Sequence, residues 1–122
     1  CSPFSFNCRE IIELDESISS LVFILNFIGV NTKASCHGHL DDFRYPFPWI
    51  CIYDKDYDKL SAIVKEYNKK SSIEWKIALD TPSGEWILRP RNSDMRLSAL
   101  QKEAVHLARY LARRILKKEC LA

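Results

Sequence analysis

The chain has 122 residues, of which 47% are apolar and 28% are charged. This length predicts one domain, residues 1–122, and the composition is that of a folded protein rather than a disordered one. Only three glycines are present, at positions 29, 38 and 84, and neither GxxxxGK[ST] nor GxGxxG occurs, which excludes the glycine-rich phosphate loops. No apolar run reaches the ~18 residues of a membrane span, so we expect no membrane partner.

The five cysteines stand at positions 1, 8, 36, 51 and 120, without CxxC spacing. An odd and scattered set is typical neither of a disulfide framework nor of a zinc ribbon. No charged leader with an apolar core and a small-residue cleavage site is visible. These observations predict a reducing, cytoplasmic location.

Charge is unevenly distributed, although the net charge is only +2. Residues 9–58 carry 4 basic and 9 acidic side chains, whereas residues 59–122 carry 14 basic and 7 acidic ones. This asymmetry is compatible with an anionic partner. The basic run from Arg109 to Lys118 is compatible with contact to nucleic acid, but helix C-termini also favour cations through their dipole, and this second interpretation is preferred.

The first half of the chain predicts one helix and two strands. Residues 1–8 show no clear period and form an irregular segment. Apolar residues recur every three or four positions over residues 9–28, which predicts an amphipathic helix that ends at Gly29. Residues 30–36 and 49–53 are predicted strands, separated by a polar and aromatic loop at 40–48.

The second half repeats this order. A helix is expected from Asp54 or Asp56 to about Lys69, followed by strands at 73–80 and 85–89 that flank a turn at 81–84. Ser93 or Asp94 is expected to cap a final helix. The order α-β-β-α-β-β-α predicts an α+β domain with a four-stranded, largely antiparallel sheet and its helices on one face.

The densest group of chemically capable side chains is Ser35-Cys36-His37-Gly38-His39, at the end of the first strand. Four interpretations stay open. Cys36, His37 and His39 are candidate metal ligands, with zinc as the candidate ion, although a further ligand is needed from elsewhere. Cys36 and His39 are a candidate nucleophile and base. Otherwise the turn is a polar ligand-binding loop, or Cys36 packs in the core.

A second group is Arg89-Pro90-Arg91, at the end of the last strand. Two residues apart, Arg89 and Arg91 are expected to project to one face and to hold a phosphate or carboxylate beside the following helix start. Solvent-facing or Asp-paired arginines are the alternative. Trp49, in the aromatic segment 43–49, is a candidate stacking residue.

Ser35-Cys36-x-Gly38-His39, which Thr32 precedes and Pro48-Trp49 follows, resembles a motif of small uncharacterised bacterial and phage proteins of the Ser-Cys-x-Gly-His type. It is more distantly similar to the Thr-x-Ser-Ser-Cys-Ser-Gly-Arg motif of the wybutosine-synthesising tRNA methyltransferases, an α/β family that binds S-adenosylmethionine and tRNA. The match covers about eight residues directly. The resemblance implies site positions at Ser35, Cys36, Gly38 and His39. His39 stands where that family has arginine, so methyl transfer is not carried over.

Together these patterns predict a domain that binds a small anionic or nucleotide-like ligand, with RNA among the candidate partners. Ser35, Cys36, His37, Gly38, His39 and Trp49 would form one wall of the site, and Arg89 and Arg91 the other. His39 would donate a hydrogen bond or act in acid–base chemistry, which leaves open whether the protein is an enzyme. Two other classes remain: a metal-binding protein, and a homodimerising module that uses the first helix or the open sheet face.

Overall fold

The computed structural model describes residues 16–38, 46–81, 83–92 and 95–121. Its elements follow the order α2 (Glu16–Phe27), β1 (Thr32–Cys36), β2 (Trp49–Ile52), the 3₁₀ turn η1 (Asp54–Asp56), α3 (Tyr57–Asn68), β3 (Trp75–Asp80), β4 (Glu85–Pro90) and α4 (Leu97–Leu121). The predicted α+β order is confirmed. Residues 1–15 and the expected caps at 93 and 94 lie outside the described residues.

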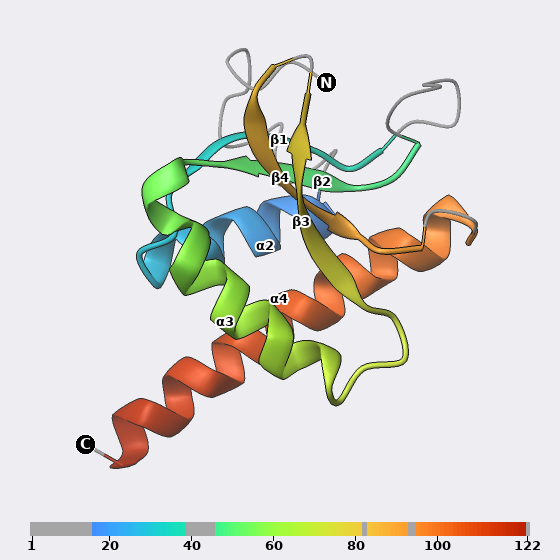
Figure 1. Cartoon of the computed structure of the whole chain (residues 1–122). Helices are drawn as coiled ribbons and strands as arrows, with labels where there is room; N and C mark the ends of the chain where they lie inside the picture. The colour runs from blue at the N-terminus through green and yellow to red at the C-terminus, as the bar shows by residue number, and fades with distance from the viewer. Residues whose placement is uncertain (1–15, 39–45, 82, 93–94, 122) are drawn as a thin grey trace.

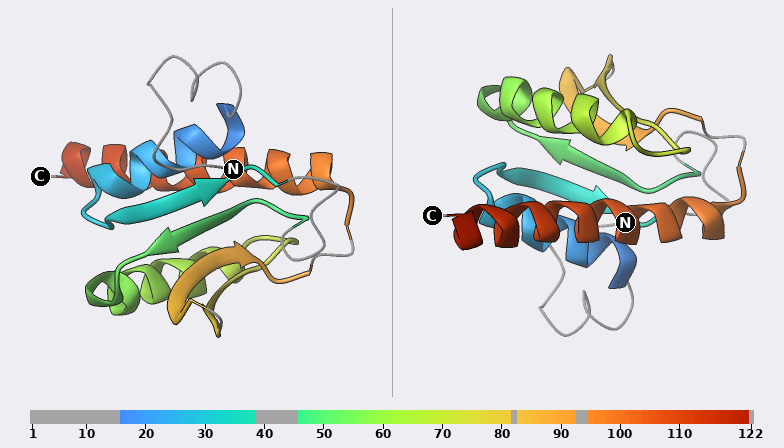
Figure 2. Two further views of the ribbon diagram at one scale, coloured as in Figure 1. Left: turned by 90° about the horizontal axis from the view of Figure 1, so that it is seen from above. Right: turned by 90° about the horizontal axis from the view of Figure 1, so that it is seen from below.

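The four strands form one sheet in the order β1-β2-β4-β3, and every neighbouring pair is antiparallel. The helices lie on one side of this sheet (Figure 1), as expected. Figure 2 shows α4 running alongside α2, against which it packs. None of the helices in the described ranges combines the length and apolarity that a membrane span requires.

The core lies between the helices and the inner face of the sheet. Paired residues of an antiparallel sheet point to the same face, and successive residues alternate. Ile50 pairs with Leu88, and both side chains are fully buried beneath the helices. Cys51 pairs with Ile87 and therefore points to the opposite face, which we call the outer face.

The end of α2 explains why β1 is shorter than the strand predicted at 30–36. Gly29 has a φ of +96° and donates its N–H to the Asn26 carbonyl, while Val30 donates to the Leu25 carbonyl. This is the Schellman pattern of helix termination. It favours glycine, because glycine has no Cβ and adopts the left-handed backbone conformation at little cost in free energy. Val30 thus belongs to the helix cap, and the strand starts at Thr32.

A buried carboxylate joins α4 to α3 and β3. Glu103 is only 6% exposed and accepts hydrogen bonds from the Tyr67 hydroxyl, the Ser71 hydroxyl at 3.3 Å and the Trp75 indole N–H at 3.3 Å. The burial and the bond to Glu103 raise the pKa of the Tyr67 hydroxyl, which therefore stays a donor. Several donors make the burial of this charge tolerable.

We predict that Tyr67→Phe lowers the free energy of unfolding by about 1–3 kcal/mol, because it removes one donor from a buried carboxylate. Tyr110→Phe is the matched control, since Tyr110 packs edge-on against Tyr67 but its hydroxyl makes no hydrogen bond within the described residues. Urea denaturation measures both variants. Equal losses for the two would contradict the role assigned to Glu103.

Candidate functional site

The sequence group at 35–39 begins at the end of β1. Cys36 pairs with Trp49, and this pair points to the outer face. Ser35 pairs with Ile50 and so points to the inner face, toward the helices. The alternation of the strand therefore separates Ser35 from Cys36 and Trp49. His39, to which the sequence assigned the acid–base role, lies outside the described residues.

Cys36 is disulfide-bonded, and its partner is not among the described side chains. The scattered cysteine positions, which are not typical of a disulfide framework, gave no indication of this bond. A disulfide sulfur is neither a thiolate nucleophile nor a thiolate metal ligand. The catalytic and metal-binding hypotheses for Cys36 consequently apply only to the reduced protein. Within the described ranges, no three His, Cys, Asp or Glu side chains form a group that could hold a metal ion.

Close packing explains why position 38 is a glycine, and the sequence alone does not reveal this. Its φ is +95°, and a Cβ at this position would lie 2.8 Å from the Phe47 carbonyl carbon and 2.7 Å from Leu97 Cδ1. Its N–H is donated to Cys36 Sγ at 3.4 Å. The preceding carbonyl, that of His37, accepts a hydrogen bond from Gln101 Nε2 at 3.0 Å. The turn at Gly38 thus packs against α4 and against the backbone of Phe47.

Arg89 contacts Phe47, the residue whose backbone packs against Gly38. The Arg89 guanidinium carbon lies 3.7 Å from the centre of the buried Phe47 ring, a cation–π contact, and its Nε donates to the Pro90 carbonyl at 3.2 Å. The same Phe47 contacts Gly38 through its backbone. Lys76 pairs directly with Arg89 across β3 and β4, so two cationic side chains stand next to each other on the outer face.

Arg91 contacts Glu74 and not Phe47. Its N–H donates to the Glu74 carbonyl at 2.8 Å, and its Nη1 lies 3.0 Å from Glu74 Oε1. Arg91 is therefore ion-paired, although with a glutamate and not with the aspartate that the alternative named. β4 ends at Pro90, so the period-two argument that placed both arginines on one face stops before Arg91.

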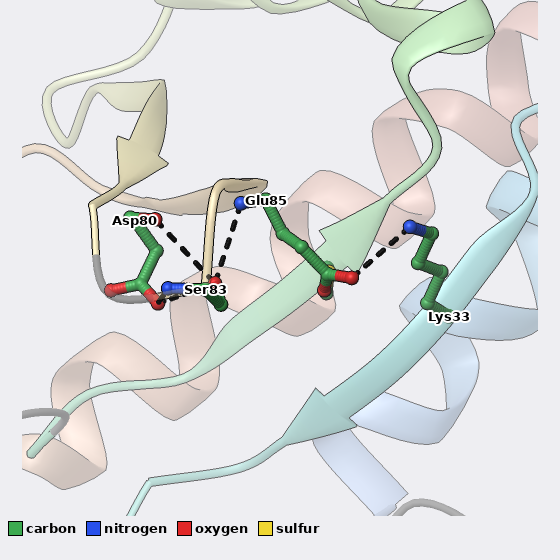
Figure 3. A network of polar contacts seen from close by, with 5 residues as sticks. Lys33, Asp80, Ser83 and Glu85 are labelled. Carbon is green, nitrogen blue, oxygen red and sulfur yellow. Dashed lines mark hydrogen bonds and ion pairs between the residues drawn. The ribbon is translucent and has the colours of Figure 1, made fainter.

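The other end of the outer face carries a network that the sequence analysis did not identify. Glu85 Oε1 lies 3.1 Å from Lys33 Nζ, and Glu85 Oε2 accepts a hydrogen bond from the Cys51 thiol at 2.7 Å. Figure 3 shows Lys33 and Glu85 reaching toward each other from β1 and β4. Ser83 and Asp80 close the adjoining hairpin through a hydroxyl–carboxylate bond of 2.6 Å.

This network keeps Cys51 as a neutral thiol. Burial, together with the hydrogen bond to the Glu85 carboxylate and its charge, raises the pKa of Cys51 to about 12. The same bonds from Cys51 and Lys33 lower the pKa of Glu85. A neutral, 3% exposed thiol is a structural hydrogen-bond donor rather than an activated nucleophile. The centre of the outer face is also less open than the sequence suggested, since Cys51 and Ile87 are both buried.

Exposed apolar side chains on α2 are relevant to the alternative hypothesis that the protein dimerises through its first helix. Phe23 and Phe27 are 70% and 63% exposed, and their rings stack with centroids 6.5 Å apart. Self-association through this helix stays a prediction.

We predict that Gly38→Ala destabilises the fold more than Gly84→Ala. Both glycines have positive φ, so each substitution carries a left-handed strain of about 1–2 kcal/mol. At Gly84 nothing lies within 4 Å of the added Cβ, whereas at Gly38 the Phe47 backbone must move, which adds about 1–3 kcal/mol. Thermal or urea denaturation compares the variants, and equal effects would show that the packing at Gly38 is not limiting.

We also predict that alkaline pH destabilises the protein through Cys51. The folded state keeps the thiol proton up to about pH 12, whereas the unfolded chain releases it above its ordinary pKa of 9.0. Unfolding therefore becomes easier as the pH rises above 9, by about 1.4 kcal/mol at pH 10. Urea denaturation at pH 8 and pH 10 should show this loss in the wild type and a smaller one in Cys51→Val. Equal losses in both proteins would contradict the prediction.

No protein-family model, curated protein or solved structure matches this chain.

Proposed function

We propose that the protein binds a small anionic ligand, such as a phosphate-bearing nucleotide, on the outer face beside Phe47. The observation that carries the proposal is the cation–π contact in which the Arg89 guanidinium carbon lies 3.7 Å from the centre of the Phe47 ring. The ring contact and the bond from Nε to the Pro90 carbonyl hold the guanidinium in place, and a planar guanidinium suits two parallel hydrogen bonds to a phosphate or carboxylate.

The charge beside Arg89 supports an anion at this position. Lys76 stands directly opposite Arg89, and like charges on directly opposite residues of a sheet destabilise it. An anion bound near Lys76 would lower the electrostatic cost of this pair. Lys76 makes no ion pair with any described residue, so its charge is not already compensated there.

The rigidity of the surroundings supports the same position. Phe47 is 2% exposed and is fixed from its backbone side by Gly38. The turn carrying Gly38 is tied to α4 through the Gln101 hydrogen bond. A preformed site loses less conformational freedom when its ligand binds. The roles of His37 and His39 toward the ligand remain part of this proposal, as does Trp49 as a stacking residue.

We expect isothermal titration at low salt to detect binding of inorganic phosphate or adenosine monophosphate. Arg89→Ala should weaken this binding by about 10- to 150-fold, the worth of one charge-assisted hydrogen-bonding group. Arg89→Lys should fall between wild type and Arg89→Ala, because it keeps the charge but loses the planar donor pair. Arg91→Ala should have a smaller effect, because Arg91 is ion-paired with Glu74.

Lys65→Ala is the control for a general loss of positive charge, since Lys65 is an exposed residue of α3. The proposal fails if the wild type binds neither probe at millimolar concentration. It also fails if Arg89→Ala binds as tightly as the wild type while remaining folded by circular dichroism.

A further inference from the structure

The solvent-facing side of α4 carries a row of cations. Lys102, His106, Arg109, Arg113 and Lys117 are all exposed. They follow one another at intervals of three or four residues, which places them on one side of the helix. At 1.5 Å per residue, the row from Lys102 to Lys117 extends about 22 Å. We call these five residues the α4 basic face.

No acid balances the α4 basic face within the described residues. The acidic residue of α4 whose side chain is described, Glu103, is buried and points toward Tyr67. Arg114, which is not part of the face, pairs with Glu66. The four Lys and Arg residues of the face make no ion pair with any described residue.

The helix dipole does not account for this arrangement. The dipole favours cations only within the last turn of a helix, which here ends at Leu121. Arg109 lies about three turns before that end, and Lys102 lies further still. Like charges four residues apart, such as Arg109 and Arg113, also weaken a helix. The face therefore opposes helix stability along most of its length.

We propose that the α4 basic face binds the phosphate backbone of a nucleic acid, at a site separate from Arg89. A polyphosphate chain offers evenly repeated negative charges over more than the length of the face. An anionic membrane fits less well, because amphipathic helices bind membranes through an apolar side, and that side of α4 is already buried in the core. The buried residues of this side are Leu100, Ala104, Leu107, Ala108 and Leu111.

Fluorescence anisotropy with labelled duplex DNA, duplex RNA and single-stranded RNA of about 20 units tests the proposal. With four Lys and Arg contacts, the logarithm of the affinity for duplex DNA should fall with the logarithm of salt at a slope of about −3.6. Raising the salt concentration from 50 to 200 mM should therefore weaken the affinity for duplex DNA about 150-fold. Arg109→Gln with Arg113→Gln should bring the slope to about −1.8 and weaken binding at 100 mM salt about tenfold or more.

Lys65→Gln with Lys69→Gln is the matched control, because it removes the same charge from exposed positions at the C-terminal end of α3. It should leave nucleic-acid binding within about twofold of wild type. Arg89→Ala should do the same, which separates this site from the small-ligand site. Equal losses in the α4 and α3 double variants would overturn the proposal, and so would the absence of binding at 50 mM salt. Binding to phosphatidylserine vesicles without binding to any nucleic acid would assign the face to a membrane and overturn it too.

Discussion

The antiparallel pairing of β2 with β4 is the constraint on which the other features of the fold depend. It joins the two halves of the chain, because β2 follows the first helix and β4 precedes the last. It also sets which residues face the core: with Ile50 opposite Leu88 on the inner face, Cys51 must be on the outer face. A shift of one residue would expose the apolar set and bury the charged one. Burial of the inner face thus fixes the position of the outer-face residues.

The register explains why two distinct polar regions lie at opposite ends of one face. β4 carries Glu85 at its start and Arg89 near its end, and both point outward because they are four residues apart. Glu85 meets a thiol and an ammonium group from β2 and β1, and is satisfied within the protein. Arg89 meets an aromatic ring and another cation. One strand therefore carries an ion-paired structural network at one end and, at the other, an arginine that lies beside an aromatic ring and a lysine.

The parts of the fold that were predicted from the sequence are those governed by short-range patterns. Period-3.6 spacing identified α3, and the glycine after α2 identified the helix end. Contacts between distant residues could not be predicted this way. Lys33 and Glu85 are 52 positions apart and meet only because of the sheet order, which one sequence does not specify. Glu103 did have a local signal, since it lies three residues after Leu100 and four before Leu107, on the apolar side of the last helix.

β1 is an edge strand with an irregularity in its pairing to β2 between Thr32 and Ala34. The residue at that irregularity, Lys33, reaches across the outer face to Glu85 and lies over the Tyr53 ring. Bulges and lysines on edge strands hinder the addition of a strand from another molecule, because the bulge breaks the regular row of donors and acceptors and the lysine charge is costly to bury. β1 is therefore a protected edge. Lys33, which pairs with Glu85, also hinders edge-to-edge aggregation of the sheet.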